Sequence, residues 1–306
     1  MNIDLSVKVG DLELMTPVIA ASGVWPYDED FWSGDKAEYL GAMCTKAISL
    51  KPRTGNMGTR LMETPAGVLN SIGLQNAGVD GFIEKYHDMV TSSDKPVIAN
   101  VVMERPEETV ETLRRLAEAG GIAAAELNIS CPNVDGDGMA WGMEPSGTAE
   151  AVRAARRAWN GPLWVKMTPQ AADPAAVARA IESEGADAIV AANTWLGMAM
   201  DMAVGKPAFD RVVAGLSGPA IFPLALRLVW QVCGAVSMPV VACGGVSGAE
   251  ECAAMLLAGA CAVEVGTAFF RDVRAGKTIC DGLPELVKKY GAGSLAEIIG
   301  CARGNG

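Results

Sequence analysis

Short apolar segments alternate with helical segments along almost the whole chain, and this alternation restricts the possible folds more than any other feature. We predict eight strands, which cover residues 17–23, 42–46, 96–100, 123–128, 163–166, 188–194, 239–245 and 262–267. Strands joined by helices run parallel, and eight such units close into a barrel rather than an open doubly wound sheet. The sequence therefore predicts an α/β protein with a (β/α)8, or TIM, barrel.

The length of 306 residues would also suit two ordinary domains. We find no Pro/Ser-rich or charged linker and no internal repeat, so one domain spanning residues 1–306 is the prediction. Residues 5–14 alternate around Gly10 and predict a short N-terminal hairpin. Expected helices cover residues 28–40, 79–89, 106–116, 148–159, 174–184 and 220–233, with another begun by a capping box of Ser247 and Glu250. Residues 49–78 and 195–218 hold no expected element and predict long active-site loops.

Polar or glycine residues mark the carboxyl end of each predicted strand. That face is where (β/α)8 barrels build their active sites. Each residue alone also has a structural explanation, such as a snorkelling lysine or a turn-capping asparagine. Their joint placement favours a binding site. The residues are Ser22, Lys46, Asn100, Asn128, Lys166, Asn193, Gly244 and Gly266.

Cys131 follows the fourth strand, in a stretch where Pro132 ends the strand ladder. The next residues, 134–143, are rich in glycine and form a candidate mobile flap. Taken alone, Cys131 also fits a small buried hydrophobic residue. A flap above a thiol instead indicates gated chemistry. The only histidine, His87, is expected at an ordinary solvated helix position, so we predict catalysis without imidazole.

Glycines follow the seventh and eighth strands, where barrels of this class bind phosphate through bare backbone N–H groups. Gly244, Gly245, Gly266 and Thr267 occupy these positions. Two strand-end lysines and several amides add donors, as an anionic, carbonyl-rich ligand such as FMN would need. The sequence shows no serine triad and no carboxylate pair at metal spacing. A cofactor is therefore expected to carry the chemistry, and no metal is predicted.

Composition narrows the possible partners. The net charge of -11 disfavours nucleic acid and anionic membrane surfaces, which repel an acidic protein. The eight cysteines include no C-x-x-C pair, so they predict neither a zinc or iron–sulfur site nor a disulfide framework. We find no signal-peptide pattern and no apolar run of about 18 residues. We expect a soluble, cytoplasmic enzyme that acts on small molecules.

Several motifs resemble those of the dihydroorotate dehydrogenases over essentially the whole chain. They lie at residues 69–76, 128–133, 165–169, 192–194 and 215–220. Cysteine before Pro132 and the lack of an N-terminal membrane helix resemble the class 1 enzymes, and residues 63–76 and 215–220 resemble class 1B. That resemblance implies a partner subunit that carries FAD and a 2Fe–2S cluster and passes electrons to NAD. The sequence departs from the class 1B pattern at Phe222, where lysine is expected, and in an acidic, Met-rich segment at residues 135–143.

The resemblance also implies roles for individual residues. Cys131 would be the general base that takes a proton from C5 of dihydroorotate while a hydride passes to FMN. The implied substrate residues are Lys46, Asn70, Ser71, Ile72, Gly73, Leu74, Asn128, Asn133, Asn193 and Thr194. The implied FMN residues are Ser22, Lys46, Ala47, Asn100, Asn128, Lys166, Ala192, Gly218, Gly244, Gly245, Gly266 and Thr267. The implied assembly is a homodimer of this chain with two iron–sulfur/FAD subunits, acting in pyrimidine biosynthesis.

Four other functions remain open at this point. A class 1A enzyme would pass its electrons to fumarate instead of NAD. A barrel of the dihydropyrimidine dehydrogenase type also has Ser-Cys-Pro but normally has histidine where this chain has Asn133. Lys46 or Lys166 would suit a Schiff-base aldolase, because strand-end lysines in barrels perform that chemistry. A non-catalytic ligand-binding barrel is the fourth.

Overall fold

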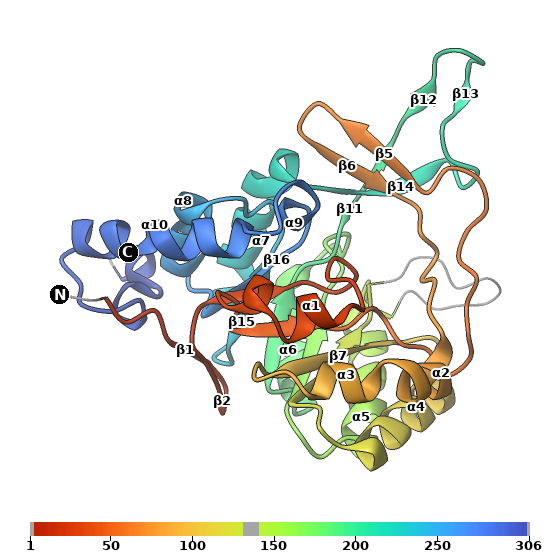
Figure 1. Cartoon of the computed structure of the whole chain (residues 1–306), viewed down its shortest axis with the longest axis horizontal. Helices are drawn as coiled ribbons and strands as arrows, with labels where there is room; N and C mark the ends of the chain where they lie inside the picture. Colours follow the sequence, from red (N-terminus) through yellow and green to blue (C-terminus); the bar gives the residue numbers. More distant parts are fainter. Residues whose placement is uncertain (1–2, 131–140, 305–306) are drawn as a thin grey trace.

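A computed structural model describes residues 3–130 and 141–304 (Figure 1). Its centre is a closed barrel of eight parallel strands in which each strand pairs with the next along the chain and the last pairs with the first. This confirms the predicted fold. The barrel strands are β3 (Val18–Ala20), β4 (Ala42–Cys44), β7 (Val97–Val102), β8 (Ala124–Asn128), β9 (Leu163–Lys166), β10 (Ala188–Ala191), β15 (Val240–Cys243) and β16 (Ala262–Val265).

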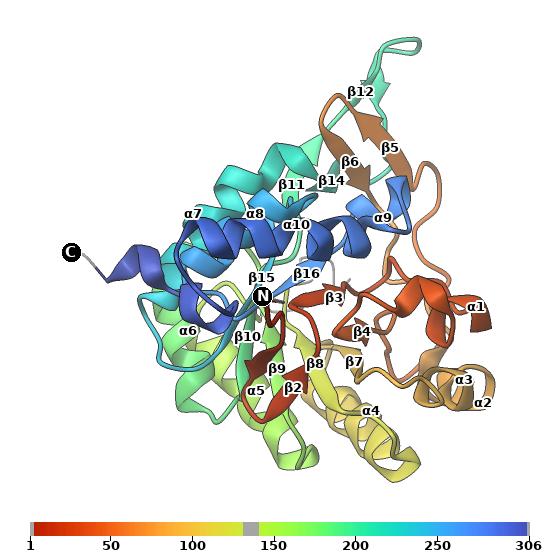
Figure 2. The same cartoon turned by 60° about the vertical axis from the view of Figure 1, so that its left-hand side comes forward.

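Helices cover the outside of the barrel, so the strands are buried on both faces and carry almost unbroken apolar runs. Figure 2 shows α4 and α5 on one side of the strands and α7, α8 and α10 on the other. The long helices are α4 (Pro106–Ala119), α5 (Pro145–Ala158), α6 (Pro174–Ser183), α7 (Phe222–Cys233), α8 (Ala249–Leu257) and α10 (Ala275–Lys289). The short helices are α1 (Glu29–Trp32), α2 (Gly78–Lys85), α3 (His87–Thr91) and α9 (Ala268–Arg271), with 3-10 turns η1 (Asp35–Ala37), η2 (Pro219–Ile221), η3 (Ala296–Ile298) and η4 (Cys301–Arg303).

Local signals explain several helix starts. Proline occupies the first turn of α4, α5 and α6, where its missing N–H costs nothing. Asp173 caps α6 by accepting a hydrogen bond from the Ala176 amide at 2.9 Å. An ion pair one turn apart supports α4, with Arg115 Nε 2.8 Å from Glu111 Oε1. The expected capping box at Ser247 is wrong, because Gly248 is the N-cap of α8 and no side chain caps that helix.

Two predicted helices are interrupted. The helix expected over residues 28–40 is wrong, because α1 ends before Gly34, where an added Cβ would lie 2.6 Å from the Asp30 carbonyl. The helix expected over residues 79–89 splits into α2 and α3 at Tyr86. The expectation of a solvated His87 is also wrong. This side chain is buried, and its Nε2 lies 2.8 Å from the Gly120 carbonyl oxygen.

A second sheet lies beyond the carboxyl ends of the barrel strands, in the two segments for which no regular structure was expected. Its antiparallel strands are ordered β11 (Trp195–Met198), β14 (Val213–Ser217), β6 (Gly67–Asn70), β5 (Leu61–Thr64). Beside it, β12 (Met200–Asp201) pairs with β13 (Lys206–Pro207), and Figure 1 shows this hairpin projecting farthest from the barrel. The expectation that neither segment holds a regular element is therefore wrong.

The N-terminal hairpin predicted from residues 5–14 is confirmed as β1 (Val7–Val9) paired with β2 (Leu12–Leu14). Gly10 makes the turn with φ +61° and lies against the Asp187 carbonyl, which precedes β10. The hairpin therefore packs at the amino end of the barrel, opposite the second sheet. Among the described residues, no helix is both long and apolar enough to cross a membrane.

Candidate functional site

A cavity of about 770 Å³ opens at the carboxyl ends of the barrel strands, between them and the second sheet. Every predicted site residue that the structure describes lines this cavity. They are Ser22, Lys46, Ala47, Asn70, Ser71, Ile72, Gly73, Leu74, Asn100, Asn128, Lys166, Ala192, Asn193, Thr194, Gly218, Gly244, Gly245, Gly266 and Thr267. Cys131 and Asn133 lie outside the described residues, as does most of the expected flap.

One end of the cavity is built from bare backbone. Gly245 has φ +76°, and an added Cβ would lie 2.6 Å from Phe222 Cα at the start of α7. Gly218 has φ +97° and would place its Cβ 2.8 Å from Gly67 Cα. On the same wall, Thr267 Oγ1 donates a hydrogen bond to Ser217 Oγ at 2.8 Å. Glycine backbone beside a hydroxyl pair gives a cradle that suits a phosphate group.

A network of amides and one hydroxyl joins two barrel strands at the cavity. Asn193 Nδ2 donates to Ser130 Oγ at 2.6 Å, and Ser130 Oγ donates to Asn128 Oδ1 at 2.5 Å. The second sheet adds Asn70, whose Nδ2 donates to the Gly215 carbonyl at 3.1 Å. Sequence reasoning missed Ser130 as a site residue, although it stands in the motif that was recognised.

Lys46 lies behind Gly23, where an added Cβ would lie 3.0 Å from the lysine Nζ. Gly23 therefore leaves the space through which this side chain passes to the cavity. Burial lowers the pKa of Lys46 from its ordinary value, because the charged form is desolvated.

The floor of the cavity is polar inside the barrel. Lys166 Nζ lies 2.5 Å from Glu264 Oε2 and 3.5 Å from Glu126 Oε1, and Asn100 Nδ2 donates to the same Glu126 oxygen. Burial alone would lower the pKa of Lys166, but the two carboxyl groups raise it well above its ordinary value. Burial, together with the neighbouring Glu264, raises the pKa of Glu126 well above its ordinary value. Sequence reasoning missed both glutamates, although each is the one charged residue that precedes the polar end of its apolar strand.

Asn100 differs from the prediction in its position. It lies within β7 rather than at the end of that strand, because pairing continues to Val102. Its side chain nevertheless lines the cavity, since alternate residues of a barrel strand face the interior.

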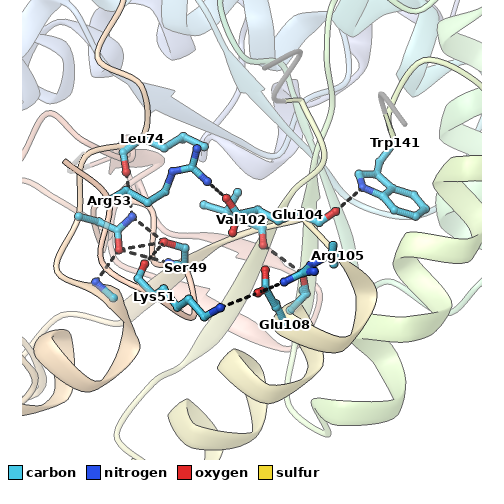
Figure 3. Close-up of polar contacts among 12 residues, drawn as sticks. Ser49, Lys51, Arg53, Leu74, Val102, Glu104, Arg105, Glu108 and Trp141 are labelled. Atoms are coloured by element: carbon cyan, nitrogen blue, oxygen red, sulfur yellow. Dashed lines mark hydrogen bonds and ion pairs between the residues drawn. The ribbon is translucent and has the colours of Figure 1, made fainter. Parts of the chain in front are cut away.

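A further polar group connects the loop after β4 to the start of α4 (Figure 3). Arg53, which lines the cavity, forms an ion pair with Glu104, and the Glu104 carbonyl accepts a hydrogen bond from Trp141 Nε1 at 2.9 Å. Nearby, Lys51 Nζ lies 3.6 Å from Glu108 Oε1. Figure 3 shows the Arg53 side chain directed toward Glu104. Arg53 was missed because only residues 63–76 of this connection carried a recognised motif.

Comparison with known proteins identifies clear relatives. The dihydroorotate dehydrogenase family model matches residues 4–287. The chain is 43% identical over 304 residues to a dihydroorotate dehydrogenase B (NAD(+)) catalytic subunit from Trichlorobacter lovleyi, covering 99% of this chain and 100% of that protein. It is 41% identical over 297 residues to the protein of the same description from Bacteroides thetaiotaomicron, covering 97% and 98%.

A solved structure supports the fold independently. The crystal structure of DHODH in complex with ferulenol from Eimeria tenella matches with a TM-score of 0.80, covering 98% of this chain and 89% of that one. At 18% sequence identity this likeness shows the barrel architecture alone.

Proposed function

The chain belongs to the dihydroorotate dehydrogenase family, and on that premise we propose that it oxidises dihydroorotate to orotate in pyrimidine biosynthesis, with FMN as the hydride acceptor. The single observation that carries the proposal is the cavity itself. One cavity of about 770 Å³ is lined by the residues that we assign to cofactor and substrate, and these residues come from distant parts of the sequence. Its volume lies within the ~300–1,000 Å³ of typical small-molecule sites.

The residues present fit FMN. Any other residue type at Gly218, Gly244 or Gly245 would place its Cβ within 3 Å of a neighbouring protein atom, so these positions need glycine, whose bare backbone can approach the phosphate. Lys46, Lys166 and Asn100 supply donors toward the carbonyl-rich ring. The remaining assigned residues are Ser22, Ala47, Asn128, Ala192, Gly266 and Thr267. When bound, FMN supplies the two-electron chemistry that protein side chains lack.

The substrate would occupy the part of the cavity between the second sheet and the amide network. We assign it to Lys46, Asn133 and Thr194, the amides Asn70, Asn128 and Asn193, and the segment 71–74. Asn193 and Asn128 are held in orientation by Ser130, so their free amide atoms are fixed toward the cavity. Cys131 follows this network directly in sequence and is proposed to take the C5 proton as a thiolate.

Electrons are proposed to leave through a partner subunit that binds FAD and a 2Fe–2S cluster and reduces NAD. The relatives described as catalytic subunits of NAD(+)-linked enzymes support this assembly. We propose a homodimer of single-domain chains with two such partners, in the cytoplasm. Transfer to fumarate is the alternative, motivated by Phe222 at a position where the class 1B pattern has lysine.

A Schiff-base aldolase that uses Lys166 is less well supported. That chemistry needs a neutral amine, whereas the two buried carboxyl groups beside Lys166 favour its ammonium form. The test is direct: the purified chain, reconstituted with FMN under anaerobic conditions, should be yellow and lose its colour on addition of dihydroorotate. Failure to bind FMN, or a flavin that dihydroorotate does not reduce, would overturn the proposed function. Covalent trapping of a lysine by borohydride would favour the aldolase.

A further inference from the structure

Four strands bring a buried polar cluster together beneath the cavity floor: Asn100 from β7, Glu126 from β8, Lys166 from β9 and Glu264 from β16. The two glutamates are 0% and 1% exposed and Lys166 is 4% exposed. Lys166 and Asn100 line the cavity, whereas the glutamates lie below them. The glutamates therefore act on a cavity ligand through residues that line the cavity, above all Lys166 and Asn100.

The charges of this cluster do not balance if every group is ionised. Two carboxylates and one ammonium leave one negative charge, which is costly inside a barrel that excludes water. Within the described residues, the other titratable groups that act on this cluster are thiols. Cys44 of β4 donates from Sγ to Glu126 Oε1 at 3.8 Å, and burial raises the pKa of Cys243 of β15 to about 12. Neither thiol supplies a positive charge, and strands β3 and β10 contribute no titratable side chain.

Two oxygen atoms show where a proton would be held. Glu126 Oε2 and Glu264 Oε1 are both buried and have no hydrogen-bond donor among the described atoms. Carboxyl oxygens of the two residues lie within 4.8 Å of one another, so a proton on one carboxyl group can be donated toward the other. The shorter contact of Lys166 is to Glu264, at 2.5 Å against 3.5 Å to Glu126. Glu264 is therefore the ionised partner and Glu126 the protonated acid.

We propose that Glu126 and Glu264 hold one proton between them beneath the cavity. The cluster then has no net charge, and the pair positions the Lys166 ammonium and the Asn100 amide toward the ligand. The two glutamates are positioning residues. The ligand is FMN only if the proposed function holds, whereas the shared proton is a property of the chain itself.

Each single substitution has a defined consequence. In Glu126→Gln an amide replaces the protonated acid, and Lys166 keeps its ion pair with Glu264. In Glu264→Gln, Glu126 loses its proton and takes over the pairing. Both variants remain neutral without a protonated carboxyl group. In the double variant Lys166 has no carboxylate partner, so burial lowers its pKa.

Infrared spectroscopy of the FMN-free chain with ¹³C-labelled glutamate tests the proton at about pH 8, where exposed carboxyl groups are ionised. Within the described residues, which include every glutamate of the chain, Glu126 and Glu264 are the only buried ones. The wild type should show one isotope-shifted band of a protonated carboxyl group. Glu126→Gln and Glu264→Gln should lose it, and Glu118→Gln, on an exposed helix position, should keep it. A wild-type spectrum without the band, or a band that survives in both single variants, would overturn the proposal even if FMN were never bound.

The positioning role is tested by FMN affinity as a function of pH. Wild type and Glu126→Gln should bind FMN equally within a few-fold from about pH 6 to 9. The double variant should bind FMN about tenfold or more weakly at the upper end of this range than at the lower end, because Lys166 loses its charge there. A double variant with the pH-independent affinity of the wild type would reject the positioning role. If the wild type binds no FMN, the proposed function fails while the infrared result still decides the proton.

Discussion

Asn193 donates a hydrogen bond to Ser130 at 2.6 Å, which ties the residues beyond β10 to those beyond β8. Ser130 in turn donates to Asn128, so one hydroxyl fixes the orientation of two cavity amides. This link stands immediately before Cys131 in the sequence.

Ser130→Ala should therefore weaken substrate use without abolishing FMN binding. The loss of a hydroxyl leaves two cavity amides without their common partner, at a cost of about 1–3 kcal/mol, or roughly 5- to 150-fold in kcat/KM. Steady-state kinetics with dihydroorotate measures this effect. Ser183→Ala, at an exposed position on α6, is the matched control and should leave kcat/KM unchanged. Unchanged kcat/KM in Ser130→Ala would show that the network does not serve the substrate.

Cys131→Ala should lose ~10²–10⁴ in the rate of flavin reduction, the usual contribution of a general base, while it keeps FMN and orotate affinity. Cys131→Ser should be active only at high pH, since a hydroxyl is a much weaker acid than a thiol. Rapid-mixing measurements separate this step from later ones. Cys301→Ala, which changes an exposed cysteine, should behave as the wild type. Near-normal reduction by Cys131→Ala would place the base elsewhere.

Gly245→Ala should reduce FMN affinity severely. The added Cβ would lie 2.6 Å from Phe222 Cα, which is backbone and cannot move aside without shifting the start of α7. Gly205→Ala separates this contact from backbone strain, because Gly205 also has positive φ but has no atom within 4 Å of the added Cβ. Fluorescence titration with FMN is the measurement. Equal affinities of the two variants would mean that close approach at the glycine wall is unimportant.

Lys46→Met should stabilise the FMN-free chain near neutral pH while it impairs catalysis. Burial lowers the pKa of Lys46 in the folded state below its ordinary value of 10.5, so the unfolded chain binds more protons between these two values. The free energy of unfolding of the wild type then rises with pH across this window, and the penalty of Lys46 is greatest below it. The stability advantage of Lys46→Met should shrink as the pH approaches 10.5. Urea denaturation at several pH values checks this, with Lys289→Met at an exposed position as the control. An advantage that does not change with pH would assign the effect to packing.

The sequence was sufficient for the barrel and for most of the described cavity lining because both depend on local patterns. Buried parallel strands are short apolar runs, and the polar or glycine residue that ends each run identifies the functional face. The second sheet has no such local signature. Its pairing of Leu69 with Leu216 joins residues far apart in the chain, and the pairing partner cannot be inferred from either segment alone.

Interior charges were missed for a related reason. Glu126 and Glu264 sit in apolar runs where a single acidic residue is read as a solvated position, and only closure of the barrel places both beside Lys166. His87 was assigned to solvent because its helix pattern carries no information on the Gly120 turn that covers it.

The purified chain alone should reduce its flavin with dihydroorotate but reduce NAD slowly. The sequence holds no Gly-x-Gly-x-x-Gly fingerprint for a dinucleotide and no cysteine cluster for an iron–sulfur centre, which agrees with the proposal that a second polypeptide supplies both functions. The experiment compares NAD reduction by the chain alone and with a co-expressed partner subunit, and fumarate reduction by the chain alone. We expect brisk NAD reduction only with the partner. Fast NAD reduction by the single chain would overturn the need for a partner, and fast fumarate reduction would assign the enzyme to the fumarate-linked class.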